Sequence, residues 1–298
     1  TIDYDDANDA NEFDKLALAG EGVVIASVDV RADNEEVDVE TVTFTIAGAA
    51  GSLANTVTNA TLLLDGVEVG TNSNSDITNT TIVFEDLNDL ILPETTTELE
   101  LMLNTANIGE DFVGEVQTGL TVTDVVFSDA EGVESGKDLA PADIVAATGF
   151  GVDDKELDIV TAIVTPSVSS TFGTDDSEAE LRLVVDGGDN TDSNGDAIQA
   201  DLEQIDIEVT SFDVAGDLFL FNGNGDQVAT VAVAANGTVS LVLGTADSIG
   251  DDDETYRLES TAEASFRVTK DGITYDVDGT SLSTKLENTL GLGSHSDS

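Results

Sequence analysis

The sequence predicts an all-β protein of two tandem Ig-like or Greek-key β-sandwich domains with few or no helices. Apolar residues make up 40% of the 298 residues and occur in short runs that alternate with polar residues. Gly-, Asn- and Asp-rich turn signals separate these runs, and segments with helical spacing are scarce. Alternation places one face of a strand inward. Many short strands between turns are typical of sandwiches and barrels.

The first half of the chain predicts a series of strands. Gly22–Val30 and Thr41–Ala47 alternate clearly, and Thr61–Gly70 reads as two strands joined at Asp65-Gly66. Both residues of that pair tolerate positive φ, which suits a tight hairpin. A short helix is a candidate over Phe84–Leu92. Further strands are expected at Thr81–Phe84, Glu98–Leu103 and Thr118–Phe127.

The second half repeats this style, with a weak helix candidate at Ile198–Ile205. Its expected strands are Leu157–Val164, Glu178–Val185, Ile205–Val209, Leu218–Phe221, Gln227–Val233, Thr238–Leu243, Tyr256–Val268 and Ile273–Val277. The matching order of strands in the two halves suggests two copies of one sandwich, although any two all-β domains resemble each other at this level.

The domain boundary is expected where Pro141, Gly149 and Gly151 interrupt the pattern. We therefore expect a flexible acidic arm over 1–21, a first sandwich over 22–148, a second over 149–290 and a flexible tail over 291–298. The arm together with residues 22–30 is a candidate segment for strand exchange, since a tethered strand can complete a neighbour's sheet. The alternative is that the strand pairs within its own domain.

Charge distinguishes this chain from ordinary globular proteins. It has 62 Asp and Glu against 9 Lys and Arg, for a formal net charge of -53. Such a chain repels itself when compact, and the screening length falls to about 3 Å at 1 M salt. We therefore expect a halophilic protein, or else an acidic surface protein neutralised by calcium or magnesium. Nucleic acid is excluded as a partner because phosphate binding needs cationic side chains.

The sequence points to an extracellular address. The chain starts at Thr1 rather than Met, which predicts a secreted product whose signal peptide has been removed. No run reaches the roughly 18 apolar residues of a membrane-spanning helix, so no membrane insertion is expected. Cysteine is absent. Candidate glycosylation sites of a secreted glycoprotein are Asn59, Asn79 and Asn236, each two residues before a Thr.

Residue types argue against catalysis. The single histidine, His295, is the fourth-last residue, whereas a Ser–His–acid triad needs a buried and oriented imidazole. Acidic pairs could perform glycoside chemistry, but so many carboxylates give no means of choosing a pair. Tryptophan is absent. We expect no catalytic residues and no organic cofactor.

Calcium is the one cofactor that a motif suggests. Residues 190–196 read Asn-Thr-Asp-Ser-Asn-Gly-Asp, with oxygen side chains at alternate positions and glycine sixth. This resembles an EF-hand-type calcium loop, in which alternation directs each oxygen at one ion. The loop departs from that pattern at Asn190, where Asp is usual, and at Asp201, where Glu is usual. The alternative is a solvated loop. The candidate ligands are Asn190, Asp192, Asn194, Asp196 and Asp201.

The strand style resembles the tandem Ig-like sandwiches of prokaryotic surface-layer and pilus-type proteins. The residues that carry this resemblance are Val42–Ile46, Thr61–Gly70, Thr95–Leu103 and Gly119–Val126. It implies an extracellular structural role. We expect a homopolymeric subunit of a filament or surface layer, joined by strand addition or cation bridges, with cell-surface contacts. The alternatives are a monomeric calcium-dependent adhesin and a tail or capsid-decoration protein of a halophile's virus.

Overall fold

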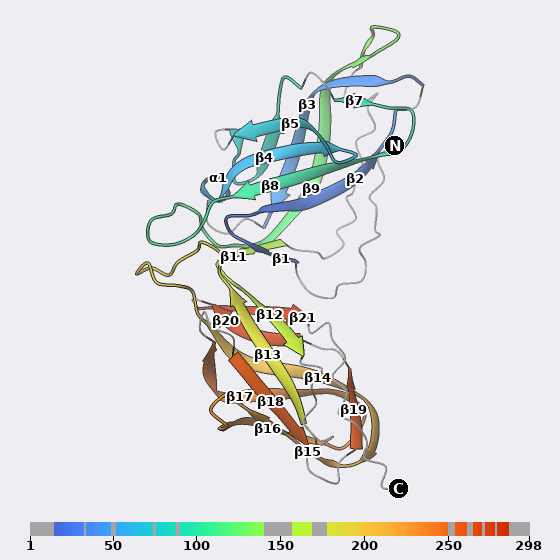
Figure 1. Ribbon diagram of the computed structural model, residues 1–298. Helices are drawn as coiled ribbons and strands as arrows, with labels where there is room; N and C mark the ends of the chain where they lie inside the picture. The colour runs from blue at the N-terminus through green and yellow to red at the C-terminus, as the bar shows by residue number, and fades with distance from the viewer. Residues whose placement is uncertain are drawn as a thin grey trace. The chain divides into compact units, whose positions relative to one another are not determined.

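A computed structural model confirms the all-β class (Figure 1). It describes residues 15–32, 34–48, 52–73, 76–87, 90–139, 157–168, 178–249, 254–260, 265–269, 272–277 and 279–285. Among these residues α1 (Leu53–Thr56) is the one helix, a single turn. The chain divides into two compact units, Thr1–Thr161 with Ser193–Gly195, and Ala162–Asp192 with Asp196–Ser298.

The first unit is a β-sandwich of two antiparallel layers, with one parallel pair at an edge. One sheet has the strand order β1-β11-β9-β3-β6, with β10 beside β9 and β7 beside β3, and the other has the order β2-β8-β4-β5. Its strands are β1 (Lys15–Leu18), β2 (Gly22–Val30), β3 (Val37–Ala47), β4 (Val57–Leu64), β5 (Val67–Ser73), β6 (Thr81–Phe84), β7 (Ile91–Leu92), β8 (Thr97–Thr105), β9 (Gln117–Gly132), β10 (Asp138–Leu139) and β11 (Leu157–Val160).

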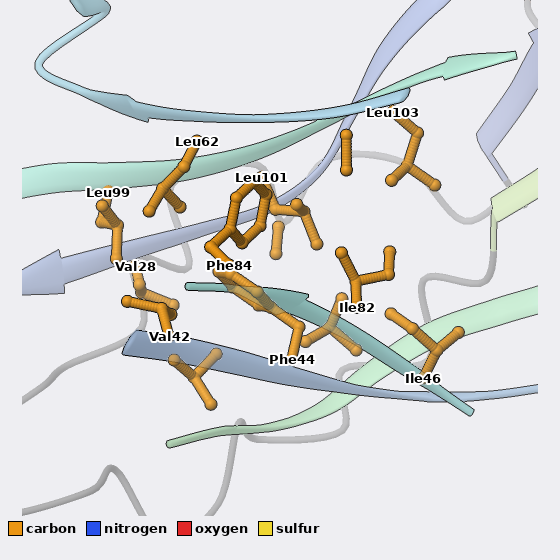
Figure 2. Close-up of a cluster of buried hydrophobic side chains, with 14 of the residues drawn as sticks. Val28, Val42, Phe44, Ile46, Leu62, Ile82, Phe84, Leu99, Leu101 and Leu103 are labelled. Atoms are coloured by element: carbon orange, nitrogen blue, oxygen red, sulfur yellow. The ribbon is translucent and has the colours of Figure 1, made fainter. Parts of the chain in front are cut away.

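The core of the first unit lies between its two sheets (Figure 2). β8 shows how alternation produces this core. Leu99, Leu101 and Leu103 are buried, whereas Glu98, which precedes Leu99, is exposed. Phe44 of β3 and Phe84 of β6 meet these leucines from the opposite layer. Their ring centroids are 6.1 Å apart at an interplanar angle of 80°, an edge-to-face geometry that aromatic pairs prefer.

The hairpin predicted at Asp65-Gly66 is confirmed. Asp65 has φ 48 and Gly66 has φ 74, and Leu64 pairs with Val67 across the turn. Positive φ at both central residues gives a turn whose twist matches that of the strands. The turn is also fixed to β8, because the Asp65 backbone N–H donates to the Glu98 carbonyl at 2.8 Å.

The second unit is also a sandwich. One sheet has the order β12-β13-β18-β15-β16, and the other has the order β17-β14-β20-β21 with β19 beside β14. Its strands are β12 (Ile163–Val168), β13 (Glu178–Asp186), β14 (Ala200–Val214), β15 (Gly216–Phe221), β16 (Gln227–Val233), β17 (Gly237–Ile249), β18 (Glu254–Ser260), β19 (Ser265–Thr269), β20 (Gly272–Val277) and β21 (Thr280–Lys285).

Two buried tyrosines link the sheets of the second unit. The Tyr256 hydroxyl on β18 donates to the Asp247 carboxylate on β17 at 2.9 Å. From the opposite sheet, the Tyr275 hydroxyl on β20 accepts the Val164 backbone N–H of β12 at 3.2 Å. Burial of the ring and the acidic partner Asp247 raise the pKa of Tyr256 far above its usual value. Each tyrosine therefore satisfies its one polar group while filling the core.

The structure corrects the expected start of the second domain. The segment 157–164 is two strands rather than one: β11 pairs with β9 and β1 in the first unit, and β12 pairs with β13 in the second. The boundary expected between 148 and 149 lies outside the described residues, and the division into units falls at Thr161 and Ala162. Periodicity identifies a strand but not the sheet in which it pairs.

The idea that the halves are copies is also corrected. β2 and β3 lie in different sheets of the first unit, whereas β12 and β13, their expected counterparts, are hydrogen-bonded neighbours. Neither helix candidate forms a helix: Phe84 ends β6, Ile91 and Leu92 form β7, and Ala200 begins β14. Residues 88–89 of the first candidate lie outside the described residues.

The expected arm is in part a strand. Residues 15–18 form β1, which pairs in parallel with β11, and residues 1–14 and the tail 291–298 lie outside the described residues. β2, the candidate exchange strand, pairs antiparallel with β8 of its own chain. No helix in the described part of the chain is long and apolar enough to cross a membrane.

Candidate functional site

The predicted calcium loop forms a closed β-turn loop. The Asp192 backbone N–H donates to the Asp196 carbonyl at 2.8 Å, and the Asp196 N–H donates to the Asp192 carboxylate at 2.9 Å. Gly195 has φ +80, and Thr191 and Ala197 form an isolated bridge just outside the turn. These are the interactions by which Asp stabilises a turn through its own side chain.

A second loop, at residues 222–226, has the same hydrogen-bond pattern. The Asn222 N–H donates to the Asp226 carbonyl at 3.0 Å, and the Asp226 N–H donates to the Asn222 amide oxygen at 3.0 Å. Gly225 holds the position of Gly195, with φ +83. Residues 192–196 and 222–226 therefore share one five-residue turn, and the oxygen side chain that begins each turn, Asp192 or Asn222, has a structural role that needs no ion.

Two of the predicted calcium ligands, Asn190 and Asp201, lie outside the turn at 192–196. Asn190 is 4% exposed, and its side-chain amide donates to the Gly187 carbonyl at 2.9 Å. Asp201 lies in β14, opposite Ser248 of β17 and Asp276 of β20. Within the described residues, no group of three or more His, Cys, Asp or Glu is arranged to hold a metal ion. Calcium at this loop stays a prediction.

The carboxylates lie on the outside of both sandwiches. The buried polar side chains of the described residues are threonines, asparagines and a glutamine, and none is a carboxylate. In β8 this placement follows from strand alternation, because Glu98 is exposed between buried Thr97 and Leu99. The charge of the described chain is therefore concentrated on its surface, where solvent ions can reach it.

Strand register places several carboxylates directly opposite one another. Asp38 of β3 is opposite Glu131 of β9, which is in turn opposite Asp138 of β10. We call these three residues the acidic row. Asp29 and Glu98 are opposed between β2 and β8, as are Asp201 and Asp276 between β14 and β20. Side chains directly opposite in an antiparallel pair share a face about 4.5–5.5 Å apart, and like charges there are destabilising.

The acidic row contains an occluded oxygen. Asp38 Oδ1 is shielded from solvent and has no hydrogen-bond partner among the described residues. A carboxylate oxygen in this state loses hydration without compensation.

Other carboxylates are held by donors from the chain. The Glu35 carboxylate accepts the backbone N–H groups of Ser135 at 2.8 Å and Glu134 at 3.0 Å. Hydrogen bonds from Ser135, first from its side chain and then from its backbone, hold the pKa of Glu35 below its usual value. The side chain of Thr97 and the Glu98 N–H likewise lower the pKa of Asp65. Glu35 therefore joins two loops, and Asp65 joins its turn to β8, so both carboxylates have a local structural role.

The three candidate glycosylation residues fall in different settings. Asn59 lies within β4, which β5 and β8 flank on both sides. Asn79 is exposed just before β6, and Asn236 is exposed in the bend between β16 and β17.

Sequence reasoning missed the acidic row and the Tyr256–Asp247 hydrogen bond. Both depend on which strands become neighbours, and alternation within one strand carries no information about its partner. The sequence signal for the row was present only as acids at the polar positions of alternating runs.

No family model matches the chain, and no curated protein matches it. Among solved structures it is similar to a glycosyl hydrolase family 2 member from Bacteroides cellulosilyticus (8% identity, TM-score 0.21, 95% of this chain and 30% of that chain). It is also similar to a β-glucuronidase from Bifidobacterium dentium (11%, 0.20, 91% and 39%) and one from Ruminococcus gnavus (10%, 0.19, 89% and 35%). The chain thus spans well under half of each of these proteins, and TM-scores this low carry no argument about activity.

Proposed function

We propose that this chain is a non-enzymatic structural subunit of an extracellular filament or surface layer in a salt-rich or cation-rich medium. The observation that carries the proposal is a net charge of -53 on a sandwich scaffold with no buried carboxylate among its described residues. External cations supply the neutralisation that nine Lys and Arg cannot.

Opposed carboxylates support the same proposal. In dilute solution the pairs Asp38–Glu131, Asp29–Glu98 and Asp201–Asp276 oppose folding. At 1 M salt the screening length is about 3 Å, shorter than the distance between directly opposite side chains. A surface with this arrangement suits a medium in which ions are always abundant.

Two routes of assembly fit the architecture. Among the described strands, β1 and β2 each end the strand order of their sheet in the first unit, so each is a candidate edge for strand addition. Acidic faces of neighbouring subunits can also share divalent cations, which take several oxygen ligands. β2 has a register shift between Val24 and Ala26. Because a bulge of this kind limits pairing at an edge, β1 is the better candidate of the two.

Negative-stain microscopy of the purified chain in about 1 M salt tests the proposal. Long polymers or sheets support assembly, and dispersed monomers at high protein concentration contradict it. Monomers whose melting temperature rises only with calcium would instead favour the calcium-dependent adhesin. Adding a chelator to any polymers separates the routes, because cation bridges dissolve and strand-joined subunits remain attached.

A further inference from the structure

A run of twenty residues in the second unit, 227–246, contains no Asp, Glu, Lys or Arg, although 24% of the residues of the whole chain are charged. The run covers β16, the bend after it and β17 as far as Ala246. Twelve of the twenty residues are exposed. Burial therefore does not explain why this run lacks charge. We call its exposed residues the uncharged corner.

A longer uncharged run in the first unit, residues 41–64, has a different explanation. It includes most of β3 and all of β4, and each of these strands has hydrogen-bonded neighbours on both sides. Four of its described residues are exposed, and its inward side chains, among them Phe44 and Leu62, belong to the core. In that run the lack of charge follows from burial.

The uncharged corner lies at the edges of two sheets. Among the described strands, β16 and β17 end the strand orders of the two sheets of the second unit, and they lie side by side (Figure 1). At the opposite ends of these sheets, β12 contains Pro166 and β21 ends at Lys285. Proline and lysine on an edge strand discourage pairing with another chain. The run 227–246 contains neither residue type, so these two edges lack that protection.

Val242 of β17 marks the apolar part of the corner. Among the described residues of the second unit, it is the large hydrophobic side chain that is most exposed, at 58%. It is opposite the uncharged Gln204 of β14. The Asp206 carboxylate nearby accepts the Ser240 hydroxyl at 2.5 Å and so is engaged within the sheet. Asp217 of β15, in register with β16, is an exposed carboxylate at the border of the corner.

We propose that two copies of this chain contact each other through the uncharged corner, about a twofold axis. Contact between acidic faces would strip water from carboxylates, which is costly without new partners. Salt shields charges across solvent, over about 3 Å at 1 M, but does not restore lost hydration. The uncharged corner avoids this cost, and interface cores of homodimers are likewise depleted of charged residues.

The partner is a second copy because the surface has no charge to attract a cationic or anionic one. The same corner on another copy is uncharged in the same way, and a patch that meets itself gives a twofold contact. This contact presupposes the assembly proposed above and adds a surface to it. A twofold contact alone closes a dimer, so a filament or layer needs a second contact, for which the β1 edge of the first unit is the candidate.

Val242→Asp tests the contact in the full chain, with Val67→Asp as the matched control. Val67 is also an exposed strand valine, at 64%, but lies in β5 of the first unit. Sedimentation over a range of protein concentrations in about 1 M salt measures association, and circular dichroism confirms folding. Val242→Asp should raise the dissociation constant about tenfold or more, because a carboxylate is buried without a partner. Val67→Asp should leave the constant unchanged.

The absence of cysteine from the chain allows a second measurement. Val242→Cys and Val67→Cys each supply a single thiol at an exposed position. A short bifunctional thiol reagent should join two copies of Val242→Cys into a covalent dimer. Under the same conditions Val67→Cys should give only the background that random collisions produce.

Three outcomes keep the contact and the proposed assembly apart. Polymers that Val242→Asp leaves unchanged, with equal cross-linking of the two cysteine variants, refute the contact and leave the assembly standing. Dimers that Val242→Asp dissociates, without longer polymers, support the contact and contradict the filament or layer. A wild-type chain that stays monomeric at high protein concentration contradicts both.

Discussion

Asp38 of β3 and Glu131 of β9 are directly opposed in antiparallel register, and one oxygen of Asp38 is shielded from solvent without a hydrogen-bond partner among the described residues. Two carboxylates in this relationship repel each other across the sheet. Their presence on a folded protein is explained if ions of the medium, rather than side chains of the protein, relieve the repulsion.

Glu131→Gln should therefore stabilise the chain at low salt by about 0.2–1 kcal/mol, the range of a cross-strand pair. The gain should disappear near 1 M salt, where screening acts over about 3 Å. Denaturant unfolding at both salt concentrations measures it. Asp124→Asn is the matched control, because Asp124 of β9 is opposite Thr45; an equal gain in both variants would mean that the opposed pair has no special effect.

Phe84→Ala should destabilise the first unit by about 3–5 kcal/mol, because it removes a ring that is 1% exposed and leaves a cavity beside Phe44. Val67→Ala is a control at a side chain that is 64% exposed, and we expect a change within about 0.5 kcal/mol. Chemical unfolding followed by circular dichroism compares them. Similar losses in the two variants would contradict the described core.

The two five-residue turns allow a direct test of calcium. If turn chemistry alone explains them, Asp192→Ala and Asn222→Ala should each lower the free energy of unfolding by about 1 kcal/mol. The two losses should be the same with calcium or with a chelator. Calorimetric titration and melting curves in both conditions check this. A calcium-dependent stabilisation that Asp192→Ala abolishes and Asn222→Ala leaves intact would establish the ion at residues 190–201.

The raised pKa of Tyr256 predicts that the free energy of unfolding falls at alkaline pH. Its pKa is raised on folding by burial and by Asp247, so the neutral phenol stabilises the folded state. That contribution is complete below the unfolded pKa of about 10 and is lost as pH rises above it. Urea unfolding between neutral and strongly alkaline pH should show this loss in the wild-type chain.

Tyr256→Phe should lower stability at neutral pH and weaken the alkaline loss. Tyr275→Phe, whose hydroxyl accepts a backbone N–H, should lower stability but keep the alkaline loss, because Tyr256 is still present. An alkaline profile that is identical in the wild-type chain and in Tyr256→Phe would show that this phenol is not responsible.

Local features of the fold could be predicted from the sequence. Alternation in 98–103 predicts a strand, which the structure shows as the slightly longer β8. Asp65-Gly66 predicts the turn between β4 and β5. Both depend on residues close in the chain. The helix predicted over 84–92 was wrong, because Phe84 packs inward as the last residue of β6 rather than continuing a helical face.

Pairing between distant strands could not be predicted. β11 and the start of β12 were expected as one strand, yet β11 joins the sheet of the first unit beside β9 and β12 pairs with β13. The acidic row has the same origin, since a shift of one residue would turn Glu131 to the other face of its sheet. The candidate calcium loop shows a different limit, because the same spacing of oxygen side chains is expected for a calcium loop and for a hydrogen-bonded turn.

The dependence of stability on salt tests the central claim most directly. Unfolding of the wild-type chain should be measured from about 0.1 M to above 1 M sodium chloride, over which the screening length falls from about 10 Å to about 3 Å. We expect the chain to be unfolded or marginal at the low end and its melting temperature to rise steeply with salt, with calcium partly restoring the fold in dilute buffer. A melting temperature that stays constant across this range would contradict the account.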